Sequence, residues 1–99
     1  MSTIVLKFGG TSVATTDLIE SAANIVKSEY DKGHNIVVVV SAMSGATNQL
    51  IEHVDKINYN DDSEYDVVVS SGEQVTAGLM SLALKKIGLP SRSWLGLQV

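Results

Sequence analysis

The chain is short and mildly acidic, and these properties already limit what it can be. Its 99 residues suffice for one small domain, and 44% hydrophobic with 18% charged residues is a globular balance, which excludes a disordered or collagen-like chain. The net charge is −4 and the lysines are scattered, so there is no basic stripe to bind nucleic acid. Cysteine is absent and histidine is scarce, which excludes a disulfide scaffold and a zinc site.

No segment of the sequence has the pattern of a membrane span or of a signal peptide. The longest apolar run, Ile36–Val40, is far shorter than the roughly 20 residues that cross a bilayer. The first three residues lead directly into a strand-like segment, without a charged region followed by an apolar one. We therefore expect a cytoplasmic protein that binds neither a membrane nor nucleic acid.

Two segments of the first half are predicted to be parallel strands. Ile4–Phe8 is rich in strand-forming residues and ends at a pair of glycines. Ile36–Val40 is an unbroken β-branched run, typical of a strand buried on both faces of a parallel sheet. With a helix between them, they predict a right-handed β-α-β unit and an α/β fold.

The helix between these strands has recognisable start and stop signals. Asp17 and Glu20 have the spacing of a capping box, and Gly33 suits the left-handed position that ends a helix. Apolar residues recur between these signals at helical spacing and predict one buried face: Ile19, Ala22, Ala23, Val26 and Tyr30.

The second half is predicted to be mainly helical. One helix is expected from about Thr47 to Ile57, followed by an exposed polar connection over Asn58–Glu64. Asp66–Val69 fits either a short strand or a helical turn. A long helix with a broad apolar surface is expected over Glu73–Ile87, closed by Gly88-Leu89-Pro90 in the order of a Schellman stop and a helix breaker.

The segment Lys7–Val13 has the composition of an anion-binding loop. A lysine at a strand end is followed by two glycines and two hydroxyl side chains. Glycines let main-chain N–H groups approach phosphate oxygens, and lysine adds a positive charge. The order of residues matches neither the Walker A loop nor the dinucleotide fingerprint. The alternative is an ordinary glycine-rich turn with an exposed lysine.

A second loop, Ser41–Asn48, follows the next strand. Ligands of open α/β sheets bind at the carboxyl ends of strands, so the hydroxyls of Ser41 and Thr47 are candidate ligand contacts. Alternatively, Thr47 or Ser44 is the N-cap of the following helix and Gly45 is a turn residue. Two such loops on neighbouring strands favour a shared crevice.

Ser70–Glu73 is predicted to precede the long helix. A glutamate in a first helical turn commonly complements the helix dipole, and this is the structural interpretation of Glu73. The functional interpretation is a carboxylate that pairs with a substrate ammonium group. The pair Asp61-Asp62 reads as a solvated loop, and no metal site is expected.

In chain order, these segments resemble the conserved motifs of aspartate kinases, within the amino acid kinase superfamily. Lys7–Val13 is similar to the signature near the start of that family, Ser41–Asn48 to its second loop, and Ser71–Glu73 to its third element. The closing Ser91–Gly96 also fits. The resemblance implies a three-layer α/β/α fold with a mainly parallel sheet. Residues 1–99 would be the N-terminal part of the catalytic domain, without its remainder and the ACT regulatory domains.

The resemblance also implies an activity, substrates and roles for residues. Aspartate kinases transfer a phosphoryl group from ATP, with Mg²⁺ carried by the nucleotide, to the β-carboxylate of L-aspartate, which begins lysine, threonine and methionine biosynthesis and leads to diaminopimelate in bacteria. Lys7 would neutralise the transferring phosphate, and Glu73 would contact the amino group of aspartate. The nucleotide side would be lined by Phe8, Gly9, Gly10, Thr11 and Ser12. Aspartate would be faced by Ser41, Ala42 and Thr47.

The sequence lacks groups that such a site requires. A substrate with two carboxylates calls for a guanidinium fork, and Arg92 is the only arginine. We therefore expect a piece of an aspartate kinase that is inactive alone, and that forms a homo-oligomer or requires its missing C-terminal half. The alternatives are another carboxylate or carbamate kinase of the same fold, and a stand-alone binding or dimerisation module.

Overall fold

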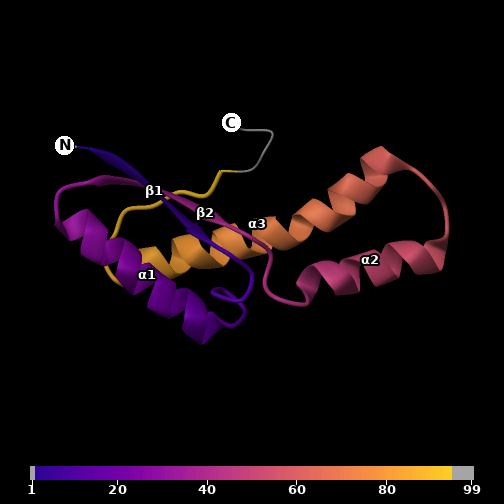
Figure 1. Cartoon of the computed structure of the whole chain (residues 1–99), viewed down its shortest axis with the longest axis horizontal. Helices are drawn as coiled ribbons and strands as arrows, with labels where there is room; N and C mark the ends of the chain where they lie inside the picture. Colours follow the sequence, from indigo (N-terminus) through magenta and orange to yellow (C-terminus); the bar gives the residue numbers. More distant parts are fainter. Residues whose placement is uncertain (1, 95–99) are drawn as a thin grey trace.

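The computed structural model describes residues 2–94, which form a parallel strand pair and three helices (Figure 1). The elements in order are β1 (Thr3–Phe8), α1 (Thr16–Asp31), β2 (Asn35–Val40), α2 (Ala46–Ile57) and α3 (Asp62–Lys86). β1 and β2 pair in parallel from Thr3 opposite Asn35 to Phe8 opposite Val40. The predicted α/β class and β-α-β unit are confirmed, and both strands end at the same edge of the sheet.

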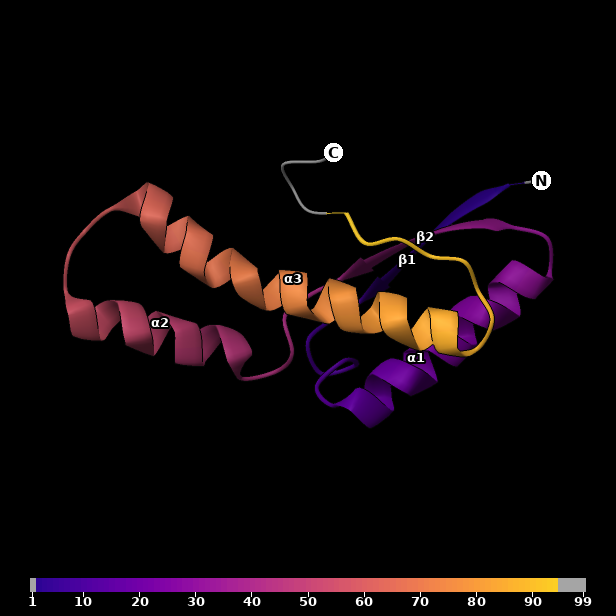
Figure 2. The same cartoon turned by 180° about the vertical axis from the view of Figure 1, so that it is seen from behind.

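The two faces of this sheet have different surroundings. α1 and α3 lie on the same side of the strands, as Figure 2 shows, and the half-buried strand residues pack into the core there: Leu6, Phe8, Ile36, Val38 and Val40. On the other side, Val5, Val37 and Val39 are 58%, 49% and 44% exposed. The prediction that the second strand is buried on both faces is therefore wrong for this chain, because no helix within residues 2–94 covers this uncovered face.

The core lies between α1, the C-terminal half of α3 and the sheet. Its buried hydrophobic members come from both helices and from the loops beside them: Val13, Ile19, Ala22, Ala23, Val26, Met80, Ala83, Leu84 and Leu89. Four residues of the predicted apolar face of the first helix are among them. Tyr30, the fifth, is 43% exposed, since it lies in the last turn of α1, beyond this core.

The C-terminus of α1 is as predicted, whereas its N-terminus differs from the predicted capping box. Thr15, not Asp17, is the N-cap: its backbone is extended and its Oγ1 accepts a hydrogen bond from the N–H of Leu18 at 3.2 Å. Asp17 lies inside the first turn, so the predicted capping box is not formed. Gly33 has a φ of +93°, and its N–H donates to the carbonyl of Tyr30, as predicted for the end of a helix.

α3 begins earlier than the sequence pattern indicates. Asp61 caps it, accepting a hydrogen bond from the N–H of Glu64 at 3.1 Å, and the helix then runs through Asp66–Val69, which settles that segment as helical. The pattern was hidden because residues 62–67 face solvent and carry no apolar periodicity. By length and composition alone, α3 is also apolar enough to cross a membrane, a property that core helices share.

The C-terminus of α3 has the predicted Schellman geometry. The N–H of Leu89 donates to the carbonyl of Leu84 at 2.9 Å, and the N–H of Gly88 donates to the carbonyl of Lys85. Gly88 has a φ of +92°, which glycine adopts without strain. Leu84 and Leu89 are both buried, so this turn anchors the end of α3 in the core. The closing segment Ser91–Gly96 follows, and its residues after Trp94 lie outside the described residues.

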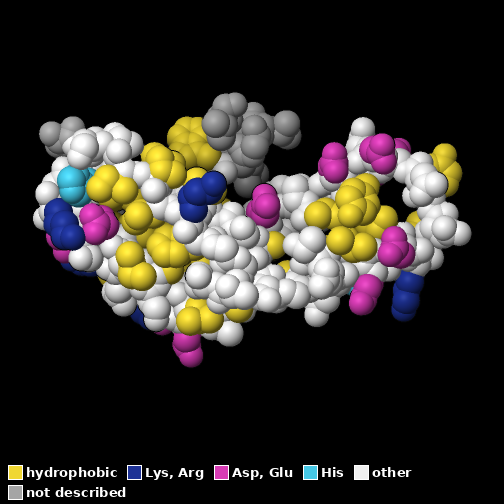
Figure 3. All heavy atoms as spheres, in the orientation of Figure 1, with side chains coloured by type: hydrophobic (Ala, Val, Ile, Leu, Met, Phe, Trp, Pro, Cys, Tyr) yellow, Lys and Arg dark blue, Asp and Glu magenta, His cyan; other side chains and the backbone are white. Residues whose placement is uncertain are grey.

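α2 and the N-terminal half of α3, residues 46–71, extend away from the rest of the molecule as an arm (Figure 1). Its hydrophobic side chains gather between the two helices, separate from those over the sheet (Figure 3). None of the residues of α2 is buried. The arm is therefore a pair of helices held mainly by their mutual contact. It joins the body through the loop that follows β2 and through the continuous helix α3.

Candidate functional site

The loops after β1 and β2, residues 9–15 and 41–45, meet at the carboxyl edge of the sheet. The N–H of Ser41 donates to the carbonyl of Phe8 at 3.1 Å, and the N–H of Ser44 donates to the carbonyl of Gly10 at 3.2 Å. The first bond ties the second loop to the end of β1, and the second joins the two loops directly. The prediction that both loops open on one edge is confirmed, and this is the edge at which open α/β sheets bind ligands.

The first loop is held at both ends and leaves main-chain donors free between them. The N–H of Ser12 donates to the carbonyl of Gly9 at 3.0 Å, which closes a turn. Val13 is fully buried in the core and fixes the end of the loop. Among the described residues, the N–H groups of Gly10 and Thr11 have no acceptor. Free N–H groups in consecutive positions are what an anion-binding loop requires.

Lys7 lies next to this loop, on the uncovered face of the sheet. It pairs in register with Val39, its side chain is exposed, and it has no ion-pair partner within residues 2–94. Its ammonium group is therefore available to a ligand. The free charge and the adjacent glycine loop agree with the expected anion-binding composition.

α1 and α2 both begin at this edge, and the start of α2 differs from the prediction. Gly45 is the N-cap, with a φ of +86°, and no side chain caps the helix. The interpretation of Thr47 or Ser44 as the N-cap is therefore wrong. The first turn of α2, which includes Thr47, thus presents N–H groups without a capping side chain, and such a helix end attracts negative charge.

The middle of α3 reaches the second loop at Gly72. A Cβ atom on Gly72 would lie 3.0 Å from the Cβ of Ala42 and 3.4 Å from Cδ1 of Leu50. Ala42 is 8% exposed, so its methyl group is buried at this contact. The close approach brings the next residue, Glu73, to the same edge of the sheet.

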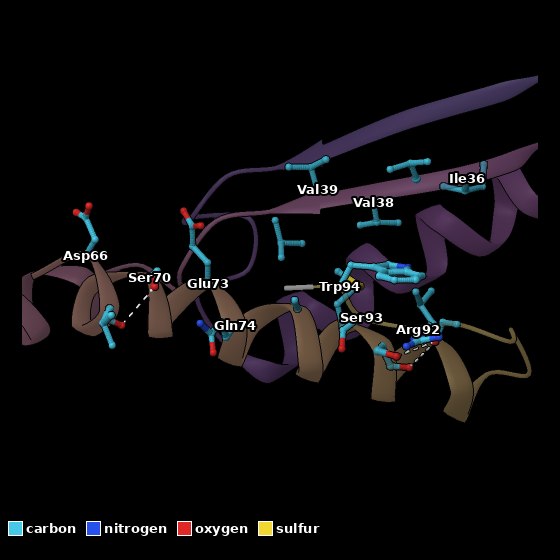
Figure 4. A pocket seen from close by; sticks show the side chains of 18 residues that line it. Ile36, Val38, Val39, Asp66, Ser70, Glu73, Gln74, Arg92, Ser93 and Trp94 are labelled. Carbon is cyan, nitrogen blue, oxygen red and sulfur yellow. Dashed lines mark hydrogen bonds between the residues drawn. The ribbon is translucent and has the colours of Figure 1, made fainter. Parts of the chain in front are cut away.

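Glu73 lies in the interior of α3, not in its first turn, so the dipole interpretation of this residue is wrong. Figure 4 shows its side chain rising from α3 toward the ends of the strands. It has no hydrogen-bond or ion-pair partner within residues 2–94. An unpaired carboxylate at this edge is available to a cationic group of a ligand, which is what the functional interpretation requires.

Glu73 also lines a cleft of about 1160 Å³ between β2 and α3. Asp66, Ser70 and Gln74 line the same end of the cleft. At the other end, the guanidinium carbon of Arg92 lies 4.4 Å from the ring centroid of Trp94 (Figure 4), a contact that the sequence pattern did not reveal.

The predicted site residues are thus brought to one edge, though not all into contact. Lys7 projects from the uncovered face, whereas Glu73 rises from α3 on the covered side, and no ion pair joins them. Within residues 2–94, no three His, Cys, Asp or Glu side chains lie close enough to hold a metal ion. The described residues form one side of a candidate site, with the cationic Lys7 and the anionic Glu73 on either side of the two joined loops.

Comparison with known proteins relates this chain to amino acid kinases. The profile of the amino acid kinase family matches residues 2–98. Aspartate kinase Ask_LysC of Stutzerimonas stutzeri is 53% identical over 100 residues, which are 100% of this chain and 24% of that protein. The aspartokinase of Rickettsia felis is 46% identical over 103 residues, 26% of its length.

A solved structure gives the same relation. The crystal structure of the aspartate kinase from Synechocystis superposes with a TM-score of 0.93 at 43% identity, over 96% of this chain and 16% of that one. The chain thus spans about a quarter of the length of the two relatives named above, and less of the crystallised chain.

Proposed function

The chain belongs to the amino acid kinase family, and from that membership we propose that it is the N-terminal part of the catalytic domain of an aspartate kinase. Its relatives by sequence and by structure are named as aspartate kinases. The observation that carries the proposal is the meeting of the two loops at the carboxyl edge of the sheet, with Glu73 brought beside them by the contact of Gly72 with Ala42.

The proposed reaction is transfer of the terminal phosphoryl group of ATP to the β-carboxylate of L-aspartate. The carboxylate oxygen attacks the γ-phosphorus, the bond to the β-phosphate oxygen breaks, and ADP and 4-phospho-L-aspartate form. A free carboxyl group with a pKa near ~4 is already ionised at neutral pH, so no general base is required. The protein then acts by positioning the substrates and neutralising charge, with Mg²⁺ arriving on the phosphates of ATP.

We assign the nucleotide side to the first loop and Lys7. The Lys7 ammonium neutralises charge that develops on the transferring phosphoryl group, and the free N–H groups of Gly10 and Thr11 bind phosphate oxygens. Phe8, Gly9 and Ser12 belong to the same segment. Because Val13 is buried and Ser12 is tied to Gly9, the loop is held in place before a ligand arrives.

We assign aspartate to the second loop and Glu73. The Glu73 carboxylate pairs with the ammonium group of aspartate, and Ser41, the main chain at Ala42 and the uncapped first turn of α2 at Thr47 face its carboxylates. The adenine pocket and the arginine that grips a substrate carboxylate belong to the rest of the domain or to a second copy. The uncovered sheet face at Val5, Val37 and Val39 is the surface that such a part covers.

The test is to restore the missing part of the domain. Residues 1–99 replace the matching region of the Stutzerimonas stutzeri kinase, which is 53% identical to them. Aspartyl phosphate is trapped with hydroxylamine in the presence of ATP and Mg²⁺. We expect activity in this chimera and none in the 99-residue chain alone. A soluble, folded chimera without activity contradicts the proposal.

The assignment of Glu73 has its own test in that chimera. Glu73→Gln removes the charge that pairs with the substrate ammonium, and a charge-assisted hydrogen bond of this kind corresponds to about tenfold or more in binding. We expect the KM for aspartate to rise by that factor, with the KM for ATP unchanged. Glu64→Gln removes the same charge from an exposed position of α3 and is the control. Equal rises in both KM values contradict the assignment.

A further inference from the structure

Two glycines that are far apart in sequence contact the same alanine. A Cβ atom on Gly10 would lie 2.9 Å from the carbonyl oxygen of Ala42, and one on Gly72 would lie 3.0 Å from the Cβ of Ala42. Carbon atoms pack without strain at about 3.5–4.0 Å, so neither position accepts a side chain without a shift. Gly10, Ala42 and Gly72 therefore form a stack that links the first loop, the second loop and α3.

The surroundings of the stack leave it little room to adjust. The N–H of Ser44 donates to the carbonyl of Gly10 and fixes the two loops on one side of the stack. On the other side, the fully buried Thr76 donates from Oγ1 to the carbonyl of Gly72 at 3.1 Å. Gly10 is thus tied to the second loop, whereas the bond at Gly72 lies within α3 and fixes the helix turn around it.

The other glycines within residues 2–94 do not share this property. Gly78 lies on the same helix, six residues after Gly72, and a Cβ there would meet nothing within 4 Å. Gly9 precedes Gly10 in the same loop and is equally unobstructed. The close approach is therefore specific to the two glycines that touch Ala42.

We propose that Ala42 is a positioning residue: its carbonyl group abuts Gly10 and its methyl group abuts Gly72, and together they set the distance from the glycine loop to Glu73. The inference rests on the proposed function for its kinetic consequence, since Glu73 follows Gly72 directly and Gly10 belongs to the phosphate side. An added methyl group at residue 72 pushes α3 away from the second loop and carries the Glu73 carboxylate with it. The separation between the two substrates' binding groups then changes, although neither group is altered.

The structural test uses the chain itself and does not depend on activity. Backbone amide NMR spectra are compared for Gly72→Ala and for the control Gly78→Ala, which adds the same methyl group to the same helix at an open position. We expect the amide signals of Gly10 and Ser44 to move in Gly72→Ala only. Unchanged signals in both variants, or equal changes in both, overturn the proposal.

The rescue variant moves the methyl group across the contact. In Gly72→Ala combined with Ala42→Gly, the clash partner is gone and the nearest remaining atom, Cδ1 of Leu50, lies at 3.4 Å on a flexible side chain. We expect the amide signals of Gly10 to return toward their original positions. Gly10→Ala meets a main-chain oxygen, which Ala42→Gly leaves in place, so that variant should not be rescued. Rescue of both variants, or of neither, contradicts the stack.

The kinetic test applies the same variants to the active chimera. Since misplacing a binding group by a fraction of an ångström is costly, we expect Gly72→Ala to raise the KM for aspartate by about tenfold, with a smaller change in kcat. The double variant should restore the KM to within about twofold, and Gly78→Ala should leave it unchanged. Equal KM values in Gly72→Ala and Gly78→Ala overturn the positioning role. An inactive chimera contradicts the proposed function instead, and the NMR comparison still decides the stack.

Discussion

The body of the molecule and its arm are built in different ways. In the body, formed by β1, α1, β2 and residues 72–86 of α3, side chains from both helices are buried in one core, with Ile19 and Val26 each 2% exposed. In the arm, α2 buries no residue, and Ile57 and Tyr59 at its tip are 80% and 78% exposed. The arm also carries six acidic side chains and one lysine, so the negative charge of the chain resides there.

This difference explains where the candidate site lies. The body provides rigid strands whose ends fix two loops, while the arm provides the first turn of α2 and the part of α3 that leads into Glu73. The two regions meet where Ala42 contacts Gly72. A site at this junction therefore takes one wall from the body and the other from the arm.

The largest expected effect is the loss of stability when a core side chain of the body is shortened. It tests whether the body provides most of the free energy of unfolding. Ile19→Ala leaves a cavity in the core and should lower the free energy of unfolding by about 4 kcal/mol. Ile57→Ala removes the same atoms from an exposed position and should change it by less than about 0.5 kcal/mol. Urea unfolding of the chain measures both. Comparable losses would show that the arm belongs to the same cooperative core.

A second comparison concerns charge. In the chimera, Lys7→Ala should lower kcat on the order of 10²–10³-fold, because it removes a cation from the developing phosphoryl charge. Lys56→Ala removes an exposed cation from the arm and should leave kcat within about twofold, since surface charges away from a site act weakly. Near-normal turnover of a folded Lys7→Ala variant would show that Lys7 contributes to solubility and not to catalysis.

The helix caps offer a matched pair with smaller effects. Thr15 caps α1 in the body and Asp61 caps α3 in the arm, each accepting one hydrogen bond from the first turn. Thr15→Ala should cost about 1 kcal/mol of global stability. Asp61→Ala should instead speed amide exchange in residues 62–65 with less than half that global loss, because this turn is exposed and can fray locally. Equal global losses would mean that the arm does not unfold separately.

The smallest expected effect comes from removing an ion pair on the surface of the body. Lys86 of α3 donates to Glu20 of α1 at 2.7 Å, and this hydrogen bond, together with the charge of Glu20, raises the pKa of Lys86 above its ordinary 10.5. The stabilisation is therefore present below pH 10.5 and is lost as the pH rises through the raised pKa. Lys86→Gln should lower Tm slightly at pH 8, and the difference from the parent should vanish at strongly alkaline pH. A difference that persists there would have to come from packing.

Some of the fold follows from local signals. The β-branched run of β2 and the glycines at positions 33 and 88 each act within a few residues, through side-chain shape and left-handed backbone conformation. The strand and the two helix ends that they predict are confirmed. The start of α3 was not predictable in this way, because its first turns face solvent and show no apolar period, and its cap at Asp61 reads equally well as part of a polar loop.

The same distinction between local signals and tertiary contacts applies to the candidate site. The residue types could be read from local sequence: a lysine at the end of one strand with glycines after it, hydroxyls after the next strand, and the segment around Glu73, each recognisable from its neighbours alone. Only the tertiary structure decided that Glu73 lies inside a helix, that α2 starts without a capping side chain, and that Ala42 is stacked between Gly10 and Gly72. The stack depends on contacts between segments at least 30 residues apart, whose geometry is set by how the helices pack on the sheet and not by any local pattern.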